Sequence, residues 1–478
     1  GAMILDAHQR ARAAADGAGL TLDDLFRRAA IRRPQAVALC DPANRDAITG
    51  TSARVLSFVA IDNAVSALAA RLRALGLRND TVVAYQLPNT VESIVTLLGI
   101  LRAGMIAAPL PLLWRGDEIA TALARCGATM LIGMTRIGAV DHRSIALEAA
   151  AAHFPLRHVG LFGVGEHDGT VALDDVLTAP AMPFAIGPRA GDASAHVAIV
   201  TFESGTDGPV AVARNHRQFQ AAASALPANV SGAVLTTLAL SSFAGLSLAV
   251  LPWLVGDAQL VLHHGFDAPT LQRQREEYRC ATLIVPGPAR EVLTDAGVLA
   301  PDHGLQRVVS LWRAPAIPAD TNPTDGVEHL DIIAIGEFAL DPAALMIRQT
   351  AAGTLALGGD MVPTGVFPPG ADRNARHVLA ISDDGMVDTG YACPDGRASL
   401  GAAASPGLVP VGGYRFKPGD LARLARAADP QATVLTLPHA LLGNRLAGTA
   451  ENPAAVEAAL ADRHPLLADA FRMPRTAA

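Results

Sequence analysis

A glycine-rich turn after a short apolar run is the part of the sequence best suited to chemistry. The run "HVAIV" leads through Glu203 into the turn Ser204-Gly205-Thr206-Asp207-Gly208. Such a turn can point several backbone N–H groups at one anion, which makes it a candidate phosphate site. The alternative is an ordinary turn after a strand, with Asp207 bonded to its own backbone rather than to a metal ion.

The cations of the chain bear on this choice. The turn carries the acids Glu203 and Asp207, and the next cation along the chain is Arg214. Arginine is plentiful, but Lys417 is the only lysine among the 478 residues. Codon bias accounts for the loss of surface lysines, but arginine does not reproduce the compact ammonium charge that a lysine brings to a reaction.

Composition excludes several classes of partner. Half of the residues are hydrophobic, which is enough for two or three domains or subdomains. The net charge is −7 and the sequence shows no basic stripe, so we expect no nucleic acid partner. The apolar runs are too short for a membrane span. The four cysteines lie far apart without C-x-x-C spacing, so we expect no metal site and a cytoplasmic location.

The pattern of elements predicts an α/β fold. Amphipathic helices alternate with short β-branched runs, beginning with a helix that Thr21 can cap. This alternation indicates largely parallel sheets in a large N-terminal domain of layered sheets and helices. A Gly/Pro-rich break, "AAASPGLVPVGGYRFKPGDL", predicts a boundary, with one domain over residues 1–411 and a small, shortened α/β domain over 412–478.

The order of motifs resembles the adenylate-forming superfamily, which comprises acyl-CoA synthetases, aryl-CoA ligases and carrier-loading adenylation domains. "LRAGMIAAPLP" is similar to a helix-to-strand segment of its first subdomain, and "ESGTDGPVAVARNH" to its phosphate loop. "LALSSFAGLSLAVLPWLVGDAQLVL" resembles the segment that lines the acyl pocket. "IAIGE" stands at the Tyr-Gly-x-Thr-Glu motif, "GMVDTGYACPDG" at Thr-Gly-Asp, and "GGYRFKPGDL" at the hinge into a mobile C-terminal domain.

The resemblance implies roles for particular residues. The 204–208 turn would cradle the phosphates of ATP or AMP, and Tyr391 would lie beside the nucleotide. Glu337 and Asp207 would be the catalytic residues, with Glu337 holding a Mg²⁺ ion that Asp207 could bridge to the phosphates. Phe243, Gly245 and Trp253 would line the acyl pocket. Each has a simpler alternative: a solvated strand-end acid for Glu337, a filler for Tyr391, and plain core for the three pocket residues.

The departures from the family pattern argue against tight binding of ATP. Val210 follows Pro209 where the family has its loop lysine, and Tyr391 replaces the aspartate that holds the ribose. Ile333 and Gly336 replace the tyrosine and threonine of the fifth motif, and the sequence ends in "FRMPRTAA" where the family continues to Gly-Lys. A carboxylate such as Asp207 about 5 Å from a phosphate costs roughly 3 kcal/mol at an effective dielectric near 20. We therefore expect weak ATP binding, and no cation reaching the cleft from the segment after Gly412.

Three functions remain open. The first is an enzyme that activates an organic acid with ATP and Mg²⁺ and passes the acyl group to CoA or a carrier-protein thiol. The second has lost adenylation, and binds an already activated acyl thioester for transfer, cyclisation or hydrolysis. The third is a non-catalytic module that docks on an acyl carrier protein or a partner synthetase.

Overall fold

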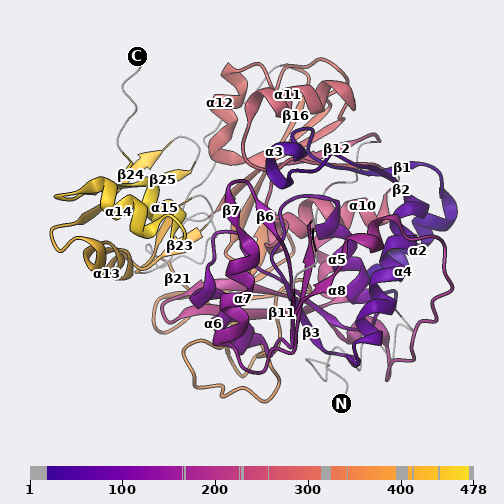
Figure 1. The fold of residues 1–478 in the computed structure, drawn as a ribbon, viewed down its shortest axis with the longest axis horizontal. Coiled ribbons are helices and arrows are strands. Elements are labelled where there is room, and N and C mark those ends of the chain that lie inside the picture. The colour runs from indigo at the N-terminus through magenta and orange to yellow at the C-terminus, as the bar shows by residue number, and fades with distance from the viewer. Residues whose placement is uncertain are drawn as a thin grey trace.

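The computed structural model describes residues 19–472, apart from 164, 166–167, 225–226, 228–230, 257, 314–324, 342, 394–406, 412–413 and 440–441. Two large sheets with helices packed around them form the body, and a smaller C-terminal unit projects from one side (Figure 1). The expected α/β fold of layered sheets and helices is confirmed.

The first large sheet has seven strands and ends in a hairpin. Its order is β11 (Gly208–Asn215), β10 (Val197–Gly205), β4 (Ile106–Pro109), β3 (Val82–Tyr85), β5 (Met130–Met134), β8 (His158–Phe162) and β9 (Val171–Ala172). All neighbours are parallel except β10 and β11, which are antiparallel. The candidate phosphate turn is therefore the tip of an edge hairpin.

The second large sheet has eight strands. Its order is β17 (Ala339–Asp341), β16 (Glu328–Ile335), β15 (Arg307–Arg313), β14 (Thr282–Pro286), β12 (Val234–Thr236), β13 (Leu260–Leu262), β1 (Val37–Cys40) and β2 (Val55–Ser57). Only the outermost pairs, β16–β17 and β1–β2, are antiparallel. The carboxyl ends of β15 and β16 bring Arg313 and the Gly336-Glu337 segment to the site.

The helices form where apolar residues recur at helical spacing, and several, such as α2, α4 and α7, begin with a capping side chain. Thr21 caps α2 as expected: its Oγ1 accepts from the Asp24 N–H at 3.0 Å, and the Asp24 side chain accepts from the Thr21 N–H at 2.9 Å. The helices are α2 (Leu22–Arg32), α3 (Arg45–Thr49), α4 (Phe58–Ala74), α5 (Val91–Arg102), α6 (Gly116–Cys126), α7 (His142–Ala152), α8 (His216–Ser224), α9 (Phe243–Gly245), α10 (Leu251–Val255), α11 (Ala268–Glu277) and α12 (Arg290–Asp295), with a π-helical turn η3 (Leu246–Val250) between α9 and α10.

Helix α5 shows where the main core lies. Every one of its residues from Val91 to Arg102 is buried, as expected for a helix enclosed on all sides. The largest apolar cluster surrounds it and draws residues from both large sheets. The two sheets are thereby held as one body, which fixes the hairpin relative to the ends of β15 and β16.

Two smaller units complete the described chain. An antiparallel sheet follows the body, with strands β18 (Met346–Gln349), β19 (Thr354–Gly358), β21 (Val387–Ala392) and β20 (Ala380–Ile381). The C-terminal unit comprises β22 (Val409–Val411), β23 (Tyr414–Phe416), α13 (Pro418–Ala428), β24 (Thr433–His439), β25 (Gly443–Thr449), α14 (Pro453–Leu460) and α15 (Pro465–Asp469). It has an apolar cluster of its own, from Val411 to Phe471.

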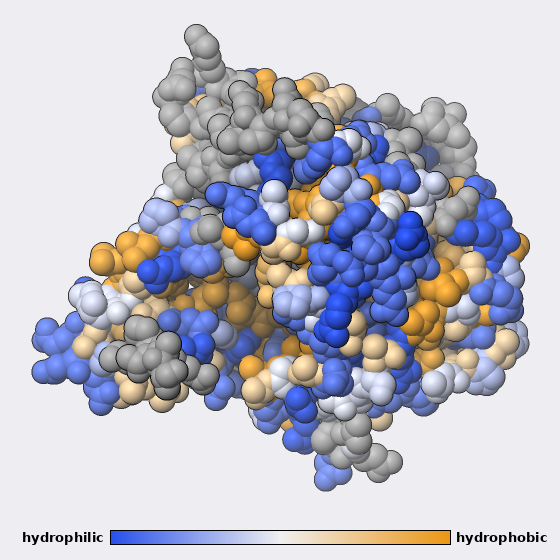
Figure 2. All heavy atoms as spheres, turned by 90° about the horizontal axis from the view of Figure 1, so that it is seen from above, coloured by the Kyte–Doolittle hydropathy of each residue, from blue (hydrophilic) through white to orange (hydrophobic). Residues whose placement is uncertain are grey.

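The molecular surface reflects this arrangement. Seen from above, hydrophilic residues cover much of the body, and the C-terminal unit projects at the left with a hollow beside it (Figure 2). Within the described part of the chain, no helix is both long and apolar enough to cross a membrane.

Candidate functional site

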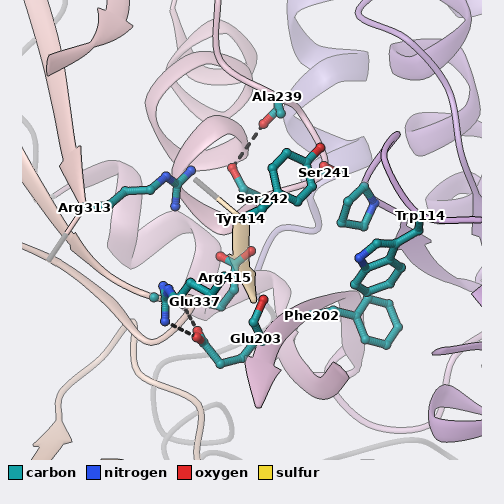
Figure 3. A pocket seen from close by; sticks show the side chains of 13 residues that line it. Trp114, Phe202, Glu203, Ala239, Ser241, Ser242, Arg313, Glu337, Tyr414 and Arg415 are labelled. Carbon is teal, nitrogen blue, oxygen red and sulfur yellow. Dashed lines mark hydrogen bonds and ion pairs between the residues drawn. The ribbon is translucent and has the colours of Figure 1, made fainter. Parts of the chain in front are cut away.

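A small pocket lined by charged, polar and aromatic residues lies where the hairpin, the carboxyl ends of two strands and the C-terminal unit meet (Figure 3). Its volume is about 80 Å³, well below the roughly 300–1,000 Å³ of typical small-molecule sites. The lining residues come from six parts of the chain: Pro111, Trp114, Phe202, Glu203, Ser204, Ala239, Ser241, Ser242, Arg313, Gly336, Glu337, Tyr414 and Arg415.

The candidate phosphate turn forms a tight hairpin. The β10–β11 pairing continues to its tip, with Ser204 opposite Pro209 and Gly205 opposite Gly208. Gly208 has φ +90°, a conformation that favours glycine, and Thr206 and Asp207 are exposed at the tip. Of the five turn residues, only Ser204 lines the pocket.

Tertiary structure brings cations to a turn that has none in its own sequence. Arg125 of α6 donates from Nη1 to the Pro209 carbonyl oxygen at 2.8 Å. Lys417, which follows β23, places Nζ 3.5 Å from the carbonyl oxygen of Thr206. The only lysine of the chain therefore lies beside the loop in space, although it is about two hundred positions away in sequence.

Glu203 is the residue around which the pocket is built. Its side chain is buried, and its Oε2 accepts the Glu337 backbone N–H at 2.6 Å. Its Oε1 forms an ion pair with Nη1 of Arg415 and lies 3.4 Å from the Tyr391 hydroxyl. Arg415 in turn lies over the Tyr391 ring, with the guanidinium carbon 4.8 Å from the ring centroid. Both carboxylate oxygens of Glu203 are thus occupied by the protein itself.

Gly336 shows that this arrangement leaves no space for a side chain at the end of β16. A Cβ atom there would lie 2.1 Å from Oε2 of Glu203 and 2.7 Å from the Tyr391 hydroxyl oxygen. Gly336 also has φ +49°, where side chains are strained. The threonine that the resemblance leads one to expect here is therefore incompatible with Glu203 in this position.

Glu337 lies at the same end of the pocket, and Arg313 extends toward it from the end of β15 (Figure 3). Oε2 of Glu337 accepts the Phe243 backbone N–H at 2.9 Å. Burial raises the pKa of Glu337 to about 7; the positive charge of Arg313 lowers it, and the negative charge of Glu203 raises it further. Glu337 is therefore a buried carboxyl that titrates near neutral pH, not a solvated strand-end acid.

Arg214 lies close to Glu337, but its guanidinium donates to backbone carbonyl groups. It donates to three carbonyl oxygens: Nε to Met361 at 2.7 Å, and Nη2 to Glu337 at 2.6 Å and Phe338 at 2.8 Å. Its guanidinium lies 3.5 Å from the centroid of the Phe243 ring, and burial lowers its pKa to about 9. Arg214 thus holds the backbone of the Glu337 segment in place and does not line the pocket.

The three residues expected in the acyl pocket lie elsewhere. Trp253 is buried against Phe26 and Phe58, and donates from Nε1 to the Ala38 carbonyl oxygen at 3.0 Å. A Cβ atom on Gly245 would lie 2.0 Å from the Ala239 carbonyl oxygen. The glycine is therefore needed because the backbone of Ala239 passes close to it, and it does not create space for a ligand.

Phe243 contributes its backbone N–H to Glu337, while its ring packs against Phe219. The members of the same segment that do line the pocket are Ala239, Ser241 and Ser242.

The structure corrects the expectation that no cation after Gly412 reaches the cleft. Arg415 belongs to β23, and its side chain is 6% exposed inside the pocket. Sequence reasoning also missed Arg313 as a pocket residue, and treated Glu203 only as an anion of the turn. Glu203 and Arg415 are 212 positions apart, so nothing local in the sequence links them.

The pocket carboxylates that could bind Mg²⁺ already accept hydrogen bonds from the protein. Glu203 and Glu337 supply carboxylate oxygens, which this ion prefers. However, the oxygens of Glu203 are taken by Arg415, Tyr391 and the Glu337 N–H, and Oε2 of Glu337 accepts from Phe243. Among the described residues, no cluster of three or more His, Cys, Asp or Glu side chains is placed to hold a metal ion.

Comparison with known proteins identifies related enzymes. The chain is 25% identical over 496 aligned residues to 2-hydroxy-7-methoxy-5-methyl-1-naphthoate–CoA ligase of Streptomyces carzinostaticus, covering 92% of this chain and 85% of that enzyme. It is 34% identical over 148 residues to salicyl-AMP ligase / salicyl-S-ArCP synthetase of Mycobacterium tuberculosis. That match covers 31% of this chain and a quarter of the ligase.

Solved structures share the fold over almost the whole chain. Mycobacterium smegmatis MbtA in its apo form superposes with a TM-score of 0.63 at 20% identity, covering 97% of this chain and 92% of that one. The amide bond synthetase McbA from Marinactinospora thermotolerans gives a TM-score of 0.67 at 16% identity, covering 94% of each. A profile described as AMP-binding enzyme matches residues 26–344, which is more than half of the sequence. The chain therefore belongs to the AMP-binding enzyme family, whose members are adenylate-forming enzymes.

Proposed function

We propose that this protein binds an organic acyl group in the family cleft and transfers it to the thiol of CoA or of a carrier protein. Membership of the family, together with relatives named as aryl-acid and acyl-CoA ligases, supports acyl chemistry on an organic acid or its activated form. The Trp114 and Phe202 rings meet edge to face at 5.5 Å on one side of the pocket, a wall suited to a planar aromatic acyl group.

One observation favours an acyl group that arrives already activated. The carboxylate of Glu203 and the guanidinium of Arg415 fill the space between the hairpin, Glu337 and Tyr391, to which the family resemblance assigns the nucleotide. ATP would have to displace this pair, and its phosphates would then face an uncompensated carboxylate. A thioester carries no charge at its reacting carbon and avoids that cost.

In this proposal the cationic side chain of Arg313 acts on the acyl oxygen. Attack of the acceptor sulfur on the thioester carbon places negative charge on the carbonyl oxygen, and the donor sulfur then leaves as a thiol. Arg313 lines the pocket, and a fixed cation near such a developing charge lowers the barrier, whereas Arg415 is already paired with Glu203. Glu337 titrates near neutral pH, so it can take the proton of the attacking thiol and return it to the leaving one.

An acyl-transfer assay tests the proposal. The protein is incubated with an acceptor thiol and, in parallel, with aryl thioesters alone or with aryl acids, ATP and Mg²⁺; mass spectrometry then measures acylated acceptor. We expect ATP-independent transfer from at least one thioester, reduced by Glu337→Gln. Product formed only from the free acid with ATP would instead identify an ordinary AMP-forming ligase, the second candidate. Product in neither reaction would contradict both.

A further inference from the structure

The ion pair between Glu203 and Arg415 joins the hairpin of the body to the C-terminal unit inside the pocket. Glu203 lies on β10 and Arg415 on β23, and each side chain is only 6% exposed. A buried charge pair of this kind is strongly coupled, because removal of one partner leaves the other charge buried without compensation. A ligand that enters the pocket must therefore either contact this ion pair or separate it.

The surroundings of Glu203 are shaped to its carboxylate. Three groups from separate segments converge on its two oxygens: the Arg415 guanidinium, the Glu337 backbone N–H and the Tyr391 hydroxyl. The glycine at 336 provides the space for them, since even a methyl group there would overlap with Oε2. This set of donors for one carboxylate is what a site for an external anion would offer, and here the protein's own side chain occupies it.

We infer that Glu203 determines ligand specificity, by taking the place of a ligand phosphate on Arg415 and thereby excluding the polyphosphate of ATP from the cleft. This inference rests on the proposed function, because it explains why the acyl group would arrive activated. A phosphate that approached Arg415 would compete with a carboxylate already in contact and would be repelled by it. At about 5 Å and an effective dielectric near 20, that repulsion is roughly 3 kcal/mol, about a hundredfold in affinity.

Variants of Glu203 test the inference through ATP binding alone, without any acid or thioester. Glu203→Gln keeps the shape and removes the charge, and Glu203→Ser also opens the space. Calorimetry in the presence of Mg²⁺ should show ATP binding at least tenfold tighter in both variants than in the wild type. Circular dichroism checks that each variant is folded. If Glu203→Ser does not fold, the isosteric Glu203→Gln variant alone tests the inference.

A matched control uses the exposed ion pair between the same two parts of the chain. Asp117 of α6 has an 87% exposed side chain and lies 4.0 Å from Arg463. Asp117→Asn removes an equal charge at this interface but outside the pocket, and should change the ATP dissociation constant less than threefold. Arg415→Met should weaken ATP binding further, because it leaves Glu203 as an unpaired anion.

The outcomes separate the inference from the proposed function. Unchanged ATP affinity in both Glu203 variants, or an equal gain from Asp117→Asn, would overturn the inference. Tighter ATP binding by the variants supports it, even if no acyl transfer is ever detected and the proposed function fails. Micromolar ATP binding by the wild type would overturn the inference, while leaving acyl transfer to be judged by its own assay.

Discussion

The backbone N–H of Phe243 donates a 2.9 Å hydrogen bond to Oε2 of Glu337, joining the start of α9 to the end of β16. The bond accounts for part of the Glu337 environment, in which burial raises the pKa and the Phe243 N–H and Arg313 oppose the rise. The balance leaves a carboxyl whose pKa is about 7 in the folded protein, compared with about 4.3 in an unfolded chain.

The first prediction concerns pH. Because the folded pKa of Glu337 is raised, folding favours its protonated form, and this contribution to stability is lost as pH rises from about 4.5 through 7. Glu337→Gln keeps an acceptor for Phe243 and does not titrate. We expect the variant to match the wild type at pH 4 and to exceed its unfolding free energy by up to about 3 kcal/mol at pH 8.

Urea unfolding across this pH range measures the difference. Glu291→Gln, at an exposed carboxyl on α12, is the control and should not change the pH dependence. The assignment to Glu337 would be wrong if the glutamine variant lost stability with rising pH as steeply as the wild type.

The second prediction concerns Arg214. Replacement by methionine removes the donors to the carbonyl oxygens of Met361, Glu337 and Phe338, which remain buried. We expect a loss of about 3 kcal/mol in unfolding free energy, from stranded polar groups and lost ring contact. Arg348→Met, at an exposed pair with Asp384, should change stability by less than about 0.5 kcal/mol. If urea unfolding showed that Arg214→Met lost as little stability as Arg348→Met, Arg214 would not be needed for the fold.

The third prediction separates a packing glycine from a pocket glycine. Gly245→Ala places Cβ against the Ala239 carbonyl oxygen, and we expect a loss of about 2 kcal/mol or more. Gly419→Ala is the control, since no atom lies within 4 Å of a Cβ there and α13 gains a better helix former. Thermal unfolding compares the two. A fully stable Gly245→Ala variant that has lost ligand binding would restore the pocket role expected from the sequence.

Much of the architecture could be predicted because it depends on local pattern. The alternation of amphipathic helices with β-branched runs predicts the two parallel sheets, and Thr21 with Asp24 predicts the cap of α2. The resemblance of the motif order to the adenylate-forming superfamily also places Ser204, Glu337 and Tyr391 in one region, and the structure brings them together around Glu203.

The interior of the site could not be predicted, because it depends on the direction of side chains and on distant contacts. A glycine at 245 suggests space for a ligand, yet a Cβ atom there would meet the carbonyl oxygen of Ala239. Glu203 reads as an isolated acid, and its partner Arg415 follows the Gly/Pro-rich break 212 positions later. The cation beside the turn, Lys417, likewise arrives only through folding of the C-terminal unit.

The most direct test of the account is carboxylate-dependent pyrophosphate exchange by the wild-type protein. ATP, Mg²⁺ and a broad panel of aryl and alkyl acids are supplied, and incorporation of labelled pyrophosphate into ATP is followed. Val210 stands where a cation is expected and Glu203 occupies Arg415, so two losses of roughly 3 kcal/mol each lower the rate by about four orders of magnitude. We expect exchange near background with every acid, and a measurable rate only after Glu203→Ser. Brisk exchange by the wild type with any acid would contradict the account.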